Sequence, residues 1–142
     1  MRVYLDTNII IDAFAAREPW RKDAENIIRL ASLDQLEIVL SSSALTDIYY
    51  ICNKVLNDKK RTREIIKQIL TLFIIADVKK NDIIEALNLE VADLEDALVA
   101  TCSKRMKAQY IVTRNVKDFE KSSVTAIKPH DFINQFFSKK EK

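Results

Sequence analysis

Residues 3–8 read VYLDTN, and this stretch sets the interpretation of the chain that follows it. A run of three strand-forming residues ends at Asp6, and Thr7 and Asn8 then open an apolar stretch that reaches Phe14. The pattern predicts a short buried strand followed directly by a short helix. Open parallel sheets bind their ligands beyond the carboxyl ends of the strands. Asp6 therefore lies where a ligand-binding residue is expected.

The same alternation of strand and helix patterns continues along the chain. Helical spacing predicts helices at about residues 19–33, 44–56, 61–72, 81–89, 93–106 and 129–137, and short apolar runs predict strands at 38–40, 73–78, 110–113 and 124–127. The expected helix starts are Pro19, Ser41–Ser43, Asn81 or Asp82, Asp93 and Pro129. This order indicates an α/β fold with a central, mostly parallel sheet of about five strands. We expect one domain over residues 1–138 and a frayed basic tail over 139–142.

The chain of 142 residues contains no glycine, where about ten are expected at the usual share of roughly 7%. This excludes Gly-rich phosphate loops, the dinucleotide-binding fingerprint and the Gly-flanked catalytic serine. If the protein handles phosphates, it must use side chains or metal ions. Left-handed turns must also be made without glycine, and we expect them at Asn57, Asp58, Asn81 and Asn115.

Charge and cysteine content narrow the class further. A net charge of +2 does not suggest a protein that coats nucleic acid through a basic surface. Cys52 and Cys102 each lie in an apolar helical pattern without metal-ligand spacing, so we expect buried, reduced thiols. No stretch has the length of a membrane span or the pattern of a signal peptide, and we expect a cytoplasmic protein without membrane contact.

Polar residues collect where the predicted strands end. The second strand is followed by the serines and by Asp47, and the fourth by Thr113, Arg114, Asn115 and Asp118, while a helix starts at Asp93, Glu95 and Asp96. Each acid has a structural alternative, because aspartate at a helix start caps the helix and suits its dipole. Thr7, Asn8, Ser43 and Thr113 fit either ordinary turn and cap duty or hydrogen bonds to the carboxylates or a phosphate.

Asp47 and Asp96 fit the capping alternative less well, because both lie in apolar helical sequence. A carboxylate in such surroundings is costly unless it is paired or binds a metal. Acids that converge at one sheet edge repel one another, and a divalent cation with hard oxygen ligands, Mg²⁺ or Mn²⁺, would offset that repulsion. One histidine and no paired cysteines make zinc a poor candidate. The residues therefore suggest metal-dependent phosphodiester hydrolysis.

Four segments, in this order, carry a family resemblance: VYLDTN at residues 3–8, SSSALTDIYY at 41–50, DLEDALVA at 93–100 and TRNVKDF at 113–119. Together they resemble the PIN domain, the nuclease fold of VapC-type toxins and of RNA-processing proteins. The resemblance spans nearly the whole chain and implies a three-layer α/β/α fold. It also implies a metal-dependent endoribonuclease that acts on RNA as the toxin of a toxin–antitoxin pair, with a homodimeric state and a small antitoxin that occludes the site.

Residue roles follow from the four matched segments. Asp6, Asp47, Asp96 and Asp118 are the expected catalytic acids and ligands of one or two Mg²⁺ or Mn²⁺ ions, with oxygens near one common point. Supporting roles fall to Thr7, Asn8, Ser43, Asp93, Thr113 and Asn115. Arg114 and Lys117 flank the site and are candidates for contact with substrate phosphates. Whether Asp93 or Glu95 joins the site is left open by the sequence.

Alternatives remain beside this reading. A degenerate PIN domain would bind RNA or a protein without cleavage, and Asn115, where many members have aspartate, favours it. Dehalogenase-like phosphatases also begin with an aspartate after the first strand, but they need a second one where Asn8 stands. The basic residues at 59–63 begin a helix, and they suit either a solvated face or a phosphate-facing patch.

Overall fold

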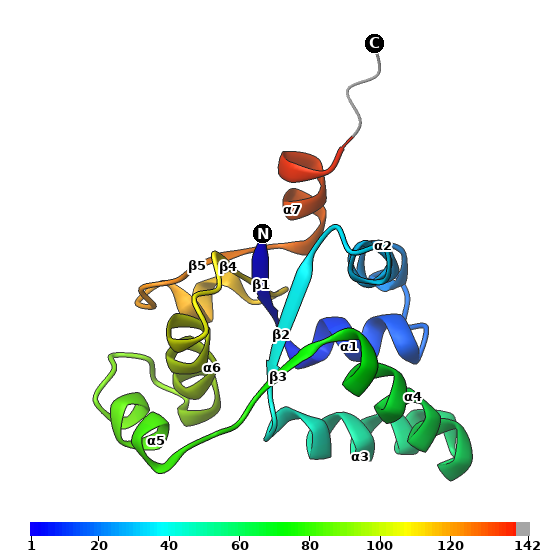
Figure 1. The fold of residues 1–142 in the computed structure, drawn as a ribbon, viewed down its shortest axis with the longest axis horizontal. Coiled ribbons are helices and arrows are strands. Elements are labelled where there is room, and N and C mark those ends of the chain that lie inside the picture. Colours follow the sequence, from blue (N-terminus) through cyan, green and yellow to red (C-terminus); the bar gives the residue numbers. More distant parts are fainter. Residues whose placement is uncertain (139–142) are drawn as a thin grey trace.

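Five strands and seven α-helices form the part of the chain that the computed structural model describes, residues 1–138 (Figure 1). The strands are β1 (Arg2–Leu5), β2 (Glu37–Ser41), β3 (Ile74–Ala76), β4 (Tyr110–Val112) and β5 (Thr125–Ile127). The helices are α1 (Thr7–Phe14), α2 (Arg21–Ser32), α3 (Ala44–Leu56), α4 (Lys59–Leu72), α5 (Lys80–Leu87), α6 (Leu94–Arg105) and α7 (Pro129–Phe136). The predicted tail at 139–142 lies outside the described residues.

The strands form one parallel sheet in the order β3-β2-β1-β4-β5. Val3 is aligned with Ile38 of β2 on one side and with Tyr110 of β4 on the other. The chain adds β2 and β3 on one side of β1, and then crosses to add β4 and β5 on the other side. The order of the strands therefore reverses between β1 and β4, which is where ligands bind in open sheets of this kind.

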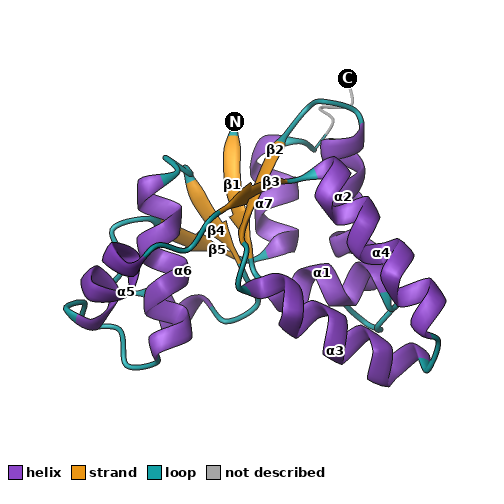
Figure 2. Cartoon of the chain, turned by 60° about the horizontal axis from the view of Figure 1, so that its bottom comes forward, coloured by secondary structure: helices purple, strands orange, loops and turns teal. Residues whose placement is uncertain are grey.

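Helices cover both faces of the sheet (Figure 2). On one face lie α5 and α6, and on the other lie α1 to α4 with α7 packed against α2. Alternate residues of the buried strands face opposite layers, so Val3 and Leu5 enter one core cluster while Tyr4 enters the other. This three-layer arrangement confirms the predicted α/β/α architecture.

Most predicted elements form within a few residues of their expected bounds, and the differences have local causes. Asn81 and Asp82 do not cap α5 but lie inside it, since Lys79 is the N-cap and its backbone N–H donates to the Asp82 carboxylate. Pro19 precedes α2 instead of starting it. A short 3₁₀ helix over Val116–Phe119, called η1 below, was not expected from its polar sequence.

Among residues 1–138, left-handed backbone is adopted by Ala16, Asp34, Asn57 and Lys107. Asn57, with φ of 51°, ends α3 as predicted. Asn115 has φ of −111°, Asp58 with φ of −152° is extended, and Asn81 lies within helix α5, so those three predictions were wrong. The other left-handed positions are fixed by the end of a helix, where the chain must turn away, and not by the identity of the side chain.

Two further expectations concern burial. Cys52 and Cys102 are both buried free thiols, as predicted. Within residues 1–138, no helix combines the length and apolarity needed to cross a membrane.

Candidate active site

A cleft of about 380 Å³ opens at the carboxyl ends of β1 and β2, beside the first turn of α6. Its location matches the point at which the strand order reverses. The polar side chains that line it are Asp6, Thr7, Asn8, Ser41, Ser43, Asp47, Glu95, Asp96 and Asn115, together with Tyr4. Side chains from five elements and three connecting segments, distant in sequence, therefore meet at one edge of the sheet.

Asp6 is held in place from both sides. Its Oδ1 accepts a hydrogen bond of 2.9 Å from the backbone N–H of Thr7, which makes Asp6 the N-cap of α1. Its Oδ2 accepts a hydrogen bond of 2.7 Å from the hydroxyl of Thr113, at the end of β4. Burial raises the pKa of Asp6 above its usual value, while the hydrogen bonds from Thr113 and Thr7 oppose that effect. Asp6 thus both caps a helix and faces the cleft.

The start of α6 separates the roles of its three acids. Asp93 is the N-cap, since its Oδ1 accepts a hydrogen bond of 3.1 Å from the backbone N–H of Asp96. Glu95 and Asp96 line the cleft. Burial, and then the charges of Asp93, Asp118 and Asp6, raise the pKa of Asp96 to about 6. Asp93 therefore caps α6, and Glu95 lines the cleft. The sequence had left open which of the two joins the site.

Asp47 faces Glu95 across the cleft. Burial raises the pKa of Glu95, and the neighbouring Asp47 carboxylate raises it further. Asp47 is itself solvent-exposed, although its apolar sequence neighbours suggested buried surroundings. It lies on the face of α3 that borders the cleft, while Ile48 points into the core. Helical periodicity separates these neighbours onto different faces.

The segment after β4 contributes one lining residue. Asn115 lines the cleft, and its backbone N–H donates a hydrogen bond of 3.0 Å to the Thr113 hydroxyl. Asp118 lies in η1 and is exposed, outside the lining of the cleft, but its charge raises the pKa of both Asp6 and Asp96. Asp118 is therefore an electrostatic neighbour of the other acids.

Four carboxylates line the cleft, those of Asp6, Asp47, Glu95 and Asp96, and no lysine, arginine or histidine of residues 1–138 does. Burial, and after it the like charges of neighbouring acids, raise the pKa of Asp6, Glu95 and Asp96. No three acidic, His or Cys side chains in residues 1–138 have the geometry to hold a metal ion. Of the four predicted acids, Asp6, Asp47 and Asp96 line this one cleft and Asp118 does not, and a common point for their oxygens stays a prediction.

Arg114 belongs to a separate cluster beside the cleft. Its Nε lies 3.0 Å from Oδ2 of the fully buried Asp12, and its guanidinium lies 3.8 Å above the Trp20 ring. Arg17 pairs with the same carboxylate at 2.9 Å and also contacts the Asn8 side chain at 3.5 Å. Arg114 is therefore held by protein groups and does not line the cleft. Lys117 is exposed and does not line it either.

Hydroxyl groups line the wall formed by β1 and β2. The Tyr4 hydroxyl lies 2.9 Å from Ser41 Oγ, which lies 3.1 Å from Ser43 Oγ. Burial raises the pKa of Tyr4 to about 12. Sequence reasoning gave neither residue a role at the site, since Tyr4 read as a strand residue and Ser41 as a helix-start serine. Their burial, which the sequence does not show, is what singles them out.

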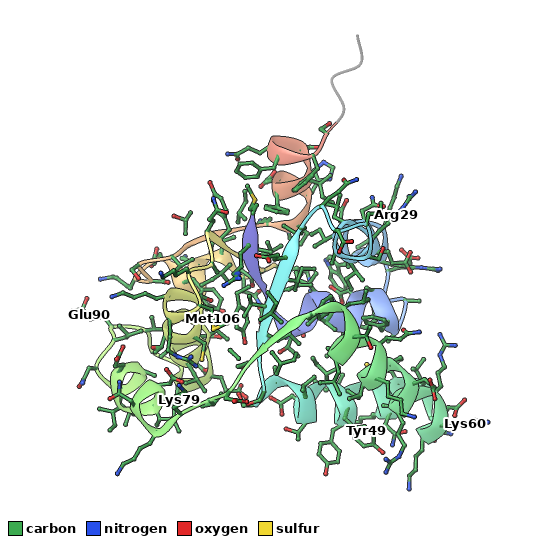
Figure 3. The ribbon with its side chains drawn as sticks, in the orientation of Figure 1. Arg29, Tyr49, Lys60, Lys79, Glu90 and Met106 are labelled. Atoms are coloured by element: carbon green, nitrogen blue, oxygen red, sulfur yellow. The ribbon has the colours of Figure 1, made fainter. Side chains whose placement is uncertain are left out.

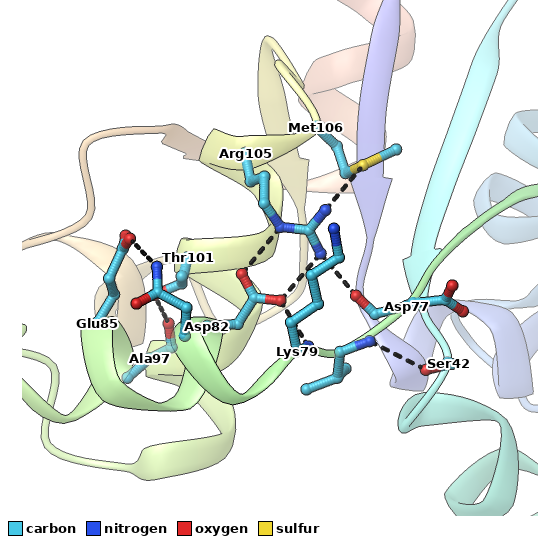
Figure 4. A network of polar contacts seen from close by, with 11 residues as sticks. Ser42, Asp77, Lys79, Asp82, Glu85, Ala97, Thr101, Arg105 and Met106 are labelled. Atoms are coloured by element: carbon cyan, nitrogen blue, oxygen red, sulfur yellow. Dashed lines mark hydrogen bonds and ion pairs between the residues drawn. The ribbon is translucent and has the colours of Figure 1, made fainter.

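A second polar network holds α5 and α6 together (Figure 4). Arg105 Nε and Nη2 donate to the two oxygens of the buried Asp82 at 2.8 and 2.9 Å, and Nη2 also donates to the backbone oxygen of Asp77. The backbone N–H of Val78 donates to the Ser42 hydroxyl at 3.3 Å. The network ties α6, which carries two of the cleft acids, to the segment that follows β3.

The basic residues at 59–63 lie away from the cleft. Lys60, in α4, and Glu90, after α5, lie on opposite sides of the molecule in Figure 3. Residues 59–63 do not line the cleft, and all but the buried Thr62 are exposed. This favours the reading of a solvated helix face.

Known proteins share this fold and sequence pattern. A relative, ribonuclease VapC1 of Aquifex aeolicus (strain VF5), is 26% identical over 140 residues, which cover 95% of each chain. The structure of VapBC2 from Rickettsia felis bound to a promoter DNA fragment matches with a TM-score of 0.67 and 21% identity, over 90% of this chain and 98% of that one.

Two more solved structures are similar. FitAB bound to a DNA fragment has a TM-score of 0.67 and 21% identity, over 89% of this chain and 94% of that one. VapC20 of Mycobacterium tuberculosis, described as a sarcin–ricin loop cleaving toxin, has a TM-score of 0.62 and 14% identity, over 77% and 86%. The family model for the PIN domain matches residues 2–117, which include all four segments except the last two residues of the fourth. With that match over most of its length, the chain belongs to the PIN domain family.

Proposed function

We propose that the protein is a metal-dependent endoribonuclease that hydrolyses RNA phosphodiester bonds. The observation that carries this is the cleft with four carboxylates and no cationic side chain from residues 1–138. Such a cleft repels a phosphate unless a divalent cation neutralises it. The name of the relative, ribonuclease VapC1, supports RNA as the substrate class.

The donor set suits a hard cation. Carboxylates of Asp6, Asp47, Asp96 and Asp118 are the proposed ligands of one or two Mg²⁺ or Mn²⁺ ions, and Glu95 is close enough to Asp47 to join them. Mg²⁺ commonly keeps several waters and binds through one or two carboxylates, so it does not need three preformed protein ligands. An ion held by these carboxylates would supply a water molecule of lowered pKa and would offset charge on the phosphate.

The protein groups hold this arrangement in position. Thr113 and the backbone of Thr7 fix both oxygens of Asp6, and the Asp93 cap fixes the first turn of α6 with Asp96. In the reaction, water forms a bond to phosphorus and the bond from phosphorus to the 3′ oxygen breaks. The water gives up a proton and the leaving 3′ oxygen gains one, so the products are a 5′ phosphate and a 3′ hydroxyl. Thr7, Asn8, Ser43 and Asn115 are neutral polar residues that line the cleft, and we assign them contacts to the phosphate or to the carboxylates.

The biological setting is part of the same proposal. The similar structures are described as VapBC2, FitAB and VapC20, the last a toxin. We propose that this chain is likewise a cytoplasmic toxin, a homodimer that a small antitoxin protein inhibits. Growth arrest on expression, with rescue by the product of an adjacent gene, tests this. Light scattering on the purified chain tests the dimer.

Cleavage assays test the enzymatic proposal. Structured and unstructured RNAs are incubated with the purified protein and Mn²⁺ or EDTA, and the ends of the products are identified. Asp6→Asn and Asp96→Asn should each lower the rate by at least about 100-fold, as expected for loss of an essential group. Asp131→Asn, the same change at an exposed position on α7, is the control.

Cleavage that persists in EDTA, or in both site variants, would rule out the metal-dependent mechanism. Absence of cleavage with tight RNA binding would instead identify a non-cleaving RNA-binding PIN domain.

A further inference from the structure

The three hydroxyls of Tyr4, Ser41 and Ser43 form a chain that runs from the interior of the sheet to the cleft. Tyr4 is 1% exposed and Ser41 is 3% exposed, whereas Ser43 is exposed and lines the cleft. Tyr4 Oη to Ser41 Oγ is 2.9 Å, and Ser41 Oγ to Ser43 Oγ is 3.1 Å. The chain therefore connects a buried phenol on β1 with a side chain at the surface of the candidate active site.

The donor and the acceptor in each of these hydrogen bonds follow from the number of protons that the three hydroxyls carry. The backbone N–H of Ser41 donates to Tyr4 Oη at 3.1 Å, and the only other described partner of that oxygen is Ser41 Oγ. A buried hydroxyl proton without an acceptor is costly, so Tyr4 must donate to Ser41 Oγ. Ser41 has one proton, and its remaining partner among residues 1–138 is Ser43 Oγ. Ser43 therefore accepts, and its own proton is available to the cleft.

The Ser43 side chain does not cap the helix at whose start it lies. It is the N-cap residue of α3, yet its side chain makes no capping hydrogen bond. In residues 1–138 its hydroxyl has a hydrogen bond to Ser41 alone and none to Asp47, one turn further on. The adjacent Ser42 differs, because its hydroxyl accepts from the backbone of Val78 and it does not line the cleft.

We propose that Ser43 donates this hydrogen bond to a non-bridging phosphate oxygen of the RNA, and that Tyr4 and Ser41 are positioning residues that orient its proton. The inference rests on the proposed function for its substrate. The carboxylates of the cleft only accept hydrogen bonds when ionised, so a phosphate there needs donors from other groups. Because the Ser43 hydroxyl accepts a hydrogen bond from Ser41, its orientation is already restricted before RNA binds. It therefore loses little rotational freedom when it donates to a phosphate oxygen.

RNA binding measures this contact without turnover. The probe is a fluorescent single-stranded RNA, titrated with Ca²⁺ in place of Mn²⁺ and followed by anisotropy, and its cleavage with Mn²⁺ is assayed separately. Ser43→Ala should weaken binding by about tenfold, which corresponds to one hydrogen bond to a charged acceptor. Ser43→Thr keeps the hydroxyl and should restore most of the affinity. Ser42→Ala is the matched control on the same loop and should bind as the wild type does.

A double-variant cycle tests the positioning role. Tyr4→Phe should weaken binding by a smaller factor, about threefold, and should add nothing to Ser43→Ala, because it acts through the same proton. A purely structural effect of Tyr4→Phe would add to Ser43→Ala instead, and thermal melts show whether it folds. Paired phosphorothioate RNAs, which differ in the stereochemistry of one sulfur, should be distinguished more strongly by the wild type than by Ser43→Ala.

Each result has a defined meaning. Equal binding by Ser43→Ala and the wild type, or an equal loss in Ser42→Ala, would overturn the contact, while wild-type cleavage would leave the proposed nuclease intact. Additive losses in the cycle would remove the positioning role of Tyr4. If any RNA binds with this pattern but none is cleaved with Mn²⁺, the nuclease proposal fails and the Ser43 contact stands. A wild type that binds no RNA would overturn the inference.

Discussion

Asp12 is a buried acid in an apolar helix, and its sequence neighbours do not reveal the two arginines that pair with it. It lies within the apolar run of α1, is fully buried, and pairs with Arg17 and Arg114. Those two arginines come from the segment after α1 and from the loop after β4, so one carboxylate joins these two segments. A buried acid is tolerated only when charged or polar partners surround it, and this requirement is met by residues about 100 positions apart.

Removing that charge should be costly. Asp12→Asn keeps the size of the side chain but leaves two guanidinium groups without their anion, so we expect a loss of about 2–3 kcal/mol in the free energy of unfolding. Urea denaturation measures it. Asp23→Asn removes an acid whose partner, His130, is exposed and 3.5 Å away, and should cost less than about 0.5 kcal/mol. Equal losses of unfolding free energy in the two variants would show that the buried Asp12 pairs stabilise the fold no more than an exposed acid does.

Asp82 should give the stability a characteristic pH dependence. Burial alone would raise its pKa, but hydrogen bonds and charge from Arg105 and the Lys79 backbone lower it below the usual 3.8. Its stabilising effect is therefore complete above pH 4 and is lost as the pH falls through the lower folded-state pKa. The difference in unfolding free energy between wild type and Asp82→Asn should be about 2 kcal/mol at pH 6, and should shrink below pH 4. A difference that grows on acidification would contradict the assignment.

At the scale of elements, the absence of glycine means that residues with a Cβ atom adopt left-handed backbone in the connections after helices. Ala16 and Lys107 adopt φ of 55° and 60° after the ends of α1 and α6. Left-handed backbone costs residues with a Cβ atom roughly 1–2 kcal/mol. Asn57 has the same conformation but belongs to the type that tolerates it best among the non-glycine residues. The sequence shows that glycine is absent. Of the positions that adopt left-handed backbone, however, only Asn57 was predicted from it.

Glycine should therefore stabilise the strained connections. Lys107→Gly is expected to raise the free energy of unfolding by about 0.5–1 kcal/mol, since relief of the left-handed strain exceeds the extra chain entropy of glycine. Chemical denaturation at neutral pH measures the change. Asn57→Gly, at a residue already suited to the conformation, should change the stability by only a few tenths of a kcal/mol. Destabilisation by Lys107→Gly would show that its side chain matters more than its backbone.

The start of α6 shows the limit of reasoning from spacing alone. Asp93 and Asp96 are three residues apart and share a helix face, so their proximity was predictable. Their roles were not, because capping depends on the direction in which the chain enters the helix. Asp93 has an extended backbone and caps, while Asp96 reaches the cleft beside Glu95.

At the scale of the whole molecule, the cleft joins elements that only the parallel sheet brings together. Residues of β1, β2, α3, α6 and the loop after β4 line it. The raised pKa values of Asp6, Glu95 and Asp96 record that burial and like charges destabilise the ionised acids. The molecule therefore carries an electrostatic cost that a bound cation would remove.

Metal ions should change the dependence of stability on pH. The pKa of Asp96 rises from 3.8 to about 6 on folding, so without metal its effect on stability is most favourable below pH 4 and is lost as the pH rises through 6. With Mn²⁺ we expect the melting temperature to rise by several degrees at pH 7.5 and by less at pH 5, because protons compete with the ion.

Thermal melts in EDTA and in Mn²⁺ at both pH values measure the effect. Asp96→Asn should flatten the pH dependence in EDTA and reduce the response to Mn²⁺, whereas Asp131→Asn should keep both. A response to Mn²⁺ that is equal at pH 5 and pH 7.5, or is unchanged in Asp96→Asn, would argue against ion binding at this cleft.

The sequence by itself determined the alternation of strands and helices, the parallel sheet, the buried thiols and the segments that carry the acids, because these depend on local periodicity and on the order of polar residues. Only the tertiary structure decided that Glu95 enters the cleft, that Asp118 borders it and that Arg114 pairs with Asp12. It also decided that Tyr4 and Ser41 supply the hydroxyl chain. These outcomes depend on side-chain direction and on contacts between residues distant in sequence, which no local pattern encodes.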